Sequence, residues 1–240
     1  MAMQRNRSLR PAPVAGRHLD DGHGLWRYAD RIAVRCHRCA APGWVVRSSR
    51  TARFRCLSCS VALQDGNNCG CAVCGPGTWV GPVRYSGQRP CGYCGHQWVR
   101  AQAHRAAASP PLTTLAAHCA QCGRSSEVSV SGSPLRDAES NDPYFGLPLL
   151  LVTRTRAGLL WAYNQAHLQA LHDYAAAPLR ERAGVANGSM FSRLPQWMKL
   201  ARNRALLQKA TARLIAQANA VRQVPTVGRQ ASPPTATRPA

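Results

Sequence analysis

The chain has 240 residues, of which 31 are lysine or arginine and 10 are aspartate or glutamate, giving a formal net charge of +21. This length allows two modest domains, and an aromatic content of 6% implies small hydrophobic cores. No apolar run approaches the ~20 residues of a membrane-spanning helix, and the arginine-rich N-terminus has no secretory segment. We therefore expect a cytoplasmic protein and exclude a membrane-spanning one.

The charge is unevenly distributed and predicts a polyanionic partner. Residues 36–125 contain ten arginines and one acidic residue, Asp65, and residues 159–240 contain eleven basic and two acidic residues. Such a field attracts nucleic acid in a salt-dependent, sequence-independent way. The alternative is an ordinary solvated surface in a GC-rich organism, because 29 of the 31 basic residues are arginine.

Residues 1–24 are basic, contain proline and show no periodicity, so we expect a disordered tail. Residues 25–99 follow, entered by an expected strand at Tyr28–Arg35. Their first motif is Cys36-x-x-Cys39, and Cys56-x-x-Cys59 follows it. The segment between the two motifs is long enough for a hairpin with strands at 44–47 and 52–55. The four thiolates could then form the tetrahedral set that Zn²⁺ prefers.

The same spacing recurs in the next part of the chain. Cys71-x-x-Cys74 precedes Cys91-x-x-Cys94 at the interval that separates the first two motifs, and Trp79 repeats the offset of Trp44. We interpret this as a tandem duplication of a zinc ribbon. In the second copy the strands are expected at 79–80 and 89–90, with a turn near 86–88. Two bound Zn²⁺ ions follow from this interpretation.

Disulfide or redox chemistry is the alternative for these cysteines. Eleven cysteines is an odd number, and five Cys-x-x-Cys motifs in series are unlike a single redox dithiol. Metal binding is therefore favoured. Zinc is preferred, but the ligands alone do not separate it from iron.

Residues 100–145 are expected to be a connector with a lone motif, Cys119-x-x-Cys122, and a strand near 127–130. Two interpretations of this motif stay open. Cys119 and Cys122 could bind a third metal ion with two ligands from Cys69, His96 and His118. Alternatively they are the remnant of a third ribbon whose second motif has been lost near 154–158.

Residues 146–222 are expected to be mostly helical, and residues 223–240 a disordered tail. A strand at 159–163 leads to Asn164 as a helix N-cap, and Pro178 is expected to kink or restart the helix. Pro195 then suits the first turn of a helix that runs to about Val221. The expected fold class is a small metal-stabilised α+β protein with two tandem zinc ribbons, a partial third and a C-terminal helical hairpin.

The C-terminal segment resembles a known family. Its motifs are Pro143-Tyr-Phe-Gly-Leu-Pro-Leu149, Leu160-Trp-Ala-Tyr-Asn164, Leu179-Arg-Glu-Arg182 and Arg193-Leu-Pro-x-Trp-Met-Lys199. Together they resemble uncharacterised bacterial tandem zinc-ribbon proteins with a helical C-terminal segment. The resemblance is carried by the part of the chain from Pro143 onward and implies no particular reaction.

Three functional hypotheses follow. The first is non-catalytic nucleic-acid binding through the ribbon hairpins, by Arg47, Arg50, Arg53, Arg55, Arg84 and Arg89, with Trp44, Trp79 or Tyr85 available to stack on bases. The two tryptophans could instead cover the metal sites. The second hypothesis is a protein adaptor that uses the ribbons or residues 144–151. The third and weakest is a metal-dependent nuclease using Asn164, His167, His172 and Asp173; no established catalytic motif supports an enzyme.

Overall fold

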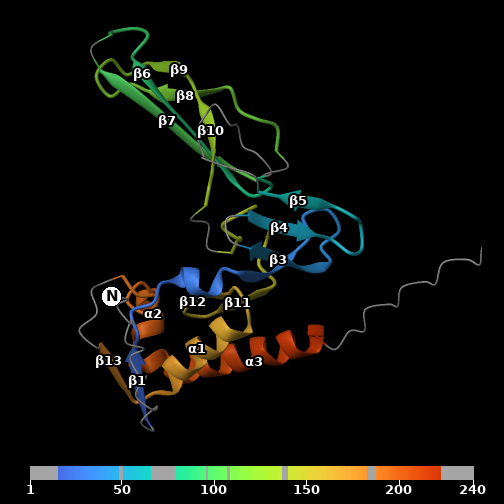
Figure 1. Ribbon diagram of the computed structural model, residues 1–240. Coiled ribbons are helices and arrows are strands. Elements are labelled where there is room, and N and C mark those ends of the chain that lie inside the picture. Colours follow the sequence, from blue (N-terminus) through green and yellow to red (C-terminus); the bar gives the residue numbers. More distant parts are fainter. Residues whose placement is uncertain are drawn as a thin grey trace, which may run out of the picture.

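The computed structural model describes residues 16–48, 51–65, 79–95, 97–106, 109–136, 140–182 and 188–222. They form a four-stranded sheet, an arm of paired strands and a helical module (Figure 1). The arm, which contains β6 to β10, extends away from the rest of the molecule, whereas the four-stranded sheet lies between it and the helices (Figure 1).

The four-stranded sheet is antiparallel, with the order β2 (Arg31–Arg35), β3 (Pro42–Ser48), β4 (Thr51–Arg55) and β5 (Ala62–Gln64). Its central hairpin, β3 and β4, lies where the sequence predicts it, and Val45 is opposite Phe54. Alternation places Ile32, Val34, Val45 and Phe54 in a buried cluster. The other face carries Trp44 and the arginines of β4.

The arm contains two pairs of strands. β6 (Val83–Pro90) and β7 (Trp98–Arg105) pair along their whole length, and β10 (Ser131–Pro134) joins the free edge of β6. β8 (Thr114–His118) pairs with β9 (Ser125–Ser129). The turn expected near 86–88 is wrong, because β6 continues through it. Gly87 allows this, since a β-carbon there would lie 2.1 Å from the carbonyl oxygen of Ser129.

The helical module begins with the hairpin of β11 (Leu151–Thr155) and β12 (Gly158–Ala162). The Asn164 side chain caps α1 (Gln165–Ala176) by accepting a 3.0 Å hydrogen bond from the backbone N–H of His167. The expected single helix after Pro195 is instead α2 (Gln196–Lys199), a 3-10 turn (Ala201–Asn203) and α3 (Arg204–Arg222). The break follows from Leu200, whose backbone is extended.

The helices α1 and α3 pack together around a buried apolar core that includes Leu168, Leu171, Leu207 and Leu214. Among the helices that the structure describes, none is long and apolar enough to cross a membrane.

Two expectations about the chain flanking α1 are wrong. Residues 17–20, expected within the disordered tail, form the strand β1 (Arg17–Asp20). Residues 179–182, expected in a restarted helix, form the strand β13 (Leu179–Arg182), which pairs in parallel with β1. Pro178 cannot donate a helical hydrogen bond, and Ala177 before it is already extended. β1 is held by Asp20, which is buried and accepts a hydrogen bond from the hydroxyl of Ser189.

The four-stranded sheet and the helical module form one body. The backbone of Ala33 in β2 bonds to Tyr163 (2.7 Å) and to Leu150 (2.9 Å), and that of Arg35 bonds to Pro148 (2.8 Å). The arm is attached differently, by the backbone on either side of it. Leu135 donates to the carbonyl of Pro82 at 2.9 Å, and Val80 donates to Phe145 at 2.8 Å.

Candidate metal centres and a basic groove

Four Cys-x-x-Cys turns in the described chain share one backbone conformation. The residue after the second cysteine is left-handed in each, with φ of 57° at Ala40, 60° at Ser60, 68° at Gly95 and 70° at Gly123. In three of them its N–H donates to the carbonyl of the first cysteine, at distances of 2.9 to 3.0 Å. This tight turn points both sulfurs to the same side.

Two of these turns bring Cys36, Cys39, Cys56 and Cys59 together as predicted. The Sγ atoms are 3.6 Å apart for Cys36 and Cys59 and 3.5 Å apart for Cys39 and Cys56. All four lie within 4.8 Å of one another. A Zn–S bond of about 2.3 Å implies tetrahedral S···S separations of about 3.8 Å, whereas a disulfide needs about 2.0 Å. The first tetrad is therefore positioned to bind a metal ion.

The second tetrad contains Cys91, Cys94, Cys119 and Cys122. The sulfurs of Cys91 and Cys122 are 3.6 Å apart, and those of Cys94 and Cys119 are 3.8 Å apart. The turn between β6 and β7 thus faces the turn between β8 and β9. This tetrad too is positioned to bind a metal ion.

This grouping corrects two expectations. The spacing in the sequence predicts a ribbon of Cys91 and Cys94 with Cys71 and Cys74, and a lone motif or third site at Cys119 and Cys122. Four thiolates already complete a tetrahedral set, so the second tetrad needs no further ligand. Cys69, Cys71, Cys74 and His96 lie outside the described residues, and His118 is exposed on β8.

The backbone of each tetrad favours one thiolate strongly. The N–H groups of Cys94 and Tyr93 lower the pKa of Cys91 to about 5 against the effect of burial. Burial opposes the ionisation of Cys56, but the N–H groups of Cys59 and Ser58 outweigh it and lower its pKa to about 6. Each tetrad therefore has one thiol prepared to bind a cation near neutral pH.

The neighbouring sulfurs have the opposite tendency. The N–H of Val61 favours the Cys59 thiolate, yet burial and the sulfur atoms around it raise its pKa to about 12. The same balance raises the pKa of Cys122 to about 11. Mutual repulsion of this kind is what a divalent cation relieves, so both donor sets suit a thiophilic metal ion.

The two tryptophans of the apparent repeat have different environments. Trp79 is buried, and its indole N–H donates to the carbonyl of Pro82 at 2.9 Å. Trp44 is only half-buried and lines a groove on the four-stranded sheet. Only Trp44 therefore keeps the option of contacting a ligand.

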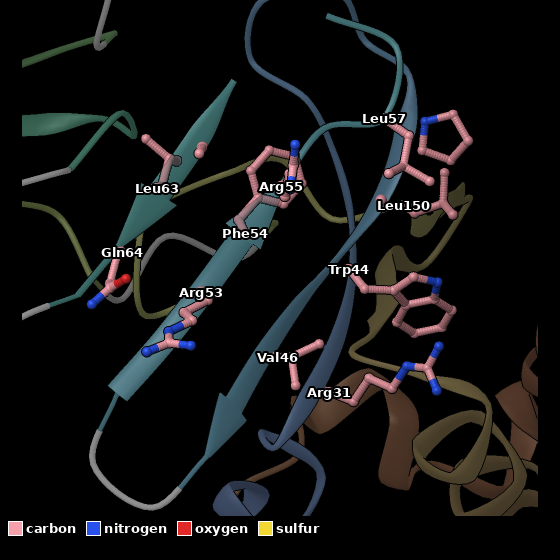
Figure 2. A pocket seen from close by; sticks show the side chains of 13 residues that line it. Arg31, Trp44, Val46, Arg53, Phe54, Arg55, Leu57, Leu63, Gln64 and Leu150 are labelled. Atoms are coloured by element: carbon pink, nitrogen blue, oxygen red, sulfur yellow. The ribbon is translucent and has the colours of Figure 1, made fainter. Parts of the chain in front are cut away.

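The groove has a volume of about 790 Å³ and lies on the face of the sheet opposite the buried cluster. Figure 2 shows Trp44 and Val46 along β3, Arg31 beside them and Arg53 and Arg55 along β4. Leu57, with 81% of its surface exposed, stands at one end. The groove thus combines an apolar floor with basic edges.

Strand register fixes how these side chains are arranged. Val46 is directly opposite Arg31 on β2 and Arg53 on β4, so an apolar residue lies between two arginines in one row. The Arg31 guanidinium lies over the ring of Trp44, 4.3 Å from its centroid. The result is a flat cationic and aromatic platform.

A second platform lies on the arm. Cross-strand pairs on one face of β6 and β7 are Arg84 with His104, Gln88 with Arg100 and Pro90 with Trp98. Trp98 is 60% exposed. Sequence reasoning missed Trp98 and Arg100. The alternation Trp98-x-Arg100-x-Gln102-x-His104 was the available signal.

The remaining predicted arginines do not converge on one surface. Arg47 lies on the opposite face of β3 from Trp44, 5.8 Å from the ring centroid of Tyr144. Arg89 donates to the carbonyl of Glu127 at 3.3 Å and braces β9. Arg50 lies outside the described residues.

The residues of the nuclease hypothesis have structural contacts. Asn164 caps α1, and His167 is buried with its Nδ1 accepting from the N–H of Tyr163 at 3.2 Å. His172 Nδ1 is 2.9 Å from the hydroxyl of Thr211, and Asp173 accepts from Gln169 at 2.8 Å.

Comparison with family models, curated proteins and solved structures found no match for this chain. The functional argument therefore rests on the geometry of the two tetrads and the two platforms.

Proposed function

We propose that the protein is a zinc-binding, zinc-ribbon protein that binds nucleic acid without catalysing a reaction on it. The observation that carries the proposal is the groove on the four-stranded sheet, where Trp44 and Val46 lie among Arg31, Arg53 and Arg55. Arginines attract and orient phosphates, and the half-buried Trp44, with the Arg31 guanidinium over its ring, contributes an aromatic surface for bases.

The charge of the arm supports the same conclusion. Its residues, 83–134, contain five arginines and one acidic residue, Glu127. One face of β6 and β7 presents Trp98 and Arg100, separately from the groove. The four-stranded sheet with the first tetrad and the arm with the second tetrad therefore each carry one aromatic and basic platform. The tetrads act in this scheme as structural sites that fix the strands, because all four ligands come from the protein.

Single-stranded nucleic acid is the favoured ligand. Stacking on Trp44 or Trp98 requires unpaired bases, and such contacts are worth about 1–3 kcal/mol per base. Both platforms are built on sheets, which offer the flat surface that splayed bases need. Duplex binding through phosphates alone would leave the tryptophans without a role.

The test compares two double charge reversals of equal size. Arg53→Glu with Arg55→Glu changes the groove, and Arg154→Glu with Arg156→Glu makes the same change, at the same spacing, on the exposed β11 end and turn. Binding to random single-stranded and duplex oligonucleotides is measured across a salt series. We expect the groove variant to lose roughly tenfold or more in affinity and to bind with a shallower salt slope, whereas the control changes little.

Equal losses in both double variants would show that only the overall charge matters, and the groove would not be the binding site. Salt-insensitive binding, or none at low salt, would reject nucleic acid altogether. Retention of a specific protein without nucleic acid would then favour the adaptor hypothesis.

A further inference from the structure

A small pocket lies in the helical module, away from both tetrads and both platforms. It has a volume of about 210 Å³ and is enclosed by β12, α1, α2 and the loop that precedes α2. Its walls are apolar and include Trp161, Leu171, Met190 and Met198. A cavity of roughly 150 Å³ with such walls can hold benzene, so this one is large enough for a small organic molecule.

The pocket has a buried end and an open end. Leu171, Met190 and Met198 are buried, whereas Gly188, Arg193 and Pro195 at its edge are exposed. A ligand could therefore enter between the loop and α2 and reach the interior. Methionine side chains adapt to ligands of differing shape, which suits such a site.

His167 is the polar group that lines the pocket from its buried side. Only 2% of its surface is exposed, and its ring is stacked on Tyr28 with centroids 4.9 Å apart. Its Nδ1 accepts from the N–H of Tyr163 at 3.2 Å, so in the neutral ring the proton resides on Nε2. Burial lowers the pKa of His167 to about 3, which keeps the ring neutral at physiological pH.

The Nε2–H group is a donor that lacks an acceptor among the residues that the structure describes. His167 is buried as a whole, so this donor gains from a partner that reaches it through the pocket. Water can enter through the open end, but it finds few polar contacts among the apolar walls at the buried end. An organic molecule with one acceptor and an apolar body satisfies both requirements.

We infer that this pocket is a binding site for a small uncharged molecule with an apolar body and one hydrogen-bond acceptor, which His167 Nε2–H recognises. An organic cation such as an ammonium group offers hydrogen-bond donors, whereas the Nε2–H group of His167 needs an acceptor. A carboxylate could pair with Arg193 only at the open edge, and at the buried end it would be desolvated next to a ring that stays neutral. The site is independent of the proposed nucleic-acid function.

The test uses two probes of similar shape, acetophenone and ethylbenzene, of which only the first has an acceptor. Binding to the full-length zinc-loaded protein is followed by NMR through the Nε2–H signal of His167. We expect acetophenone to bind, to move this signal and to bind roughly tenfold more tightly than ethylbenzene, as one neutral hydrogen bond allows. Benzoate is expected to bind more weakly than acetophenone.

Two variants keep the inference falsifiable without changing His167. Leu194→Trp replaces an aliphatic side chain of the pocket wall by a larger indole ring, and Leu179→Trp makes the same change on exposed β13. We expect the first to abolish acetophenone binding and the second to leave it intact. No binding by the native protein, equal affinities for the two probes, or unchanged binding in Leu194→Trp would each overturn the inference.

Discussion

Gly81 and Gly146 touch through their main chains. A β-carbon on Gly81 would lie 2.5 Å from the Cα of Gly146, and one on Gly146 would lie equally close to the Cα of Gly81. The ring of Trp79 covers both, within 2.9 Å of the same positions. This contact joins the base of the arm to the loop that precedes the helical module.

Alanine at either glycine should loosen this junction. Gly146 also has a φ of +73°, so Gly146→Ala adds backbone strain to the clash. We expect each variant to lower the free energy of unfolding by about 1–3 kcal/mol, with Gly146→Ala at the upper end. Gly188→Ala is the control, since nothing lies within 4 Å of its added carbon. Denaturant unfolding measures the difference, and equal stability of all three variants would contradict the close contact.

Metal counting separates the two groupings of the cysteines. The tetrads of the structure predict that Cys119→Ser lowers the metal content by one ion per chain, because Cys119 is a buried member of the second tetrad. The repeat in the sequence predicts the same loss for Cys71→Ser. We expect Cys119→Ser to lose one ion and Cys71→Ser to keep both tetrad-bound ions, measured by elemental analysis. Loss of one ion in Cys71→Ser but not in Cys119→Ser would instead support the grouping of Cys71 and Cys74 with Cys91 and Cys94.

The left-handed residues of the Cys-x-x-Cys turns offer a stabilising substitution. Ala40 and Ser60 occupy the position that glycine holds at Gly95 and Gly123. Removal of the β-carbon relieves strain of roughly 1 kcal/mol, less the entropy that glycine costs. We expect Ala40→Gly to raise the melting temperature slightly and Gly123→Ala to lower it. Calorimetry of the zinc-loaded protein provides the comparison, and destabilisation by Ala40→Gly would argue against the shared turn.

Asp142 gives the loop before Gly146 a pH dependence. Burial raises the pKa of Asp142 to about 6, although the N–H groups of Phe145, Tyr144 and Leu147 act against this. A folded-state pKa above the ordinary 3.8 means that the contribution of Asp142 to stability is lost as pH rises through about 6.

Asp142→Asn removes this titration. Between pH 5 and pH 8 the wild type should therefore lose stability with rising pH relative to the variant, as measured by the difference in their unfolding free energies. A difference that stays constant across this range would show that Asp142 does not titrate there.

The first tetrad could be predicted from sequence because its two motifs are joined by a short hairpin. Trp44–Arg47 and Ala52–Arg55 alternate as paired strands do, and the sulfurs meet as a result. The spacing of the motifs predicted the wrong partners for Cys91, because a Cys-x-x-Cys turn does not itself determine which second turn it meets. The loop between β7 and β8 lets Cys119 reach it, whereas the repeated interval between motifs pointed to Cys74 instead.

The C-terminal part shows which signals are local. Asn164 could be identified as a cap because its hydrogen bond is made to His167, in the first turn of the same helix. The pairing of Leu179–Arg182 with Arg17–Asp20 joins strands that lie far apart in the chain, so neither segment reveals it alone. The groove and the pocket likewise depend on which faces of distant elements meet. A single sequence does not show this.

The arm begins and ends at nearly the same place, where Leu135 bonds to Pro82. Neither of the two larger apolar cores contains a residue between 81 and 139. The arm keeps its own small cluster, six buried residues of which two are cysteines of the second tetrad. In architectural terms it is an insertion into a complete smaller protein. Its removal between Pro82 and Leu135 should leave a folded chain with one metal ion, and its own folding should be the step most sensitive to zinc supply.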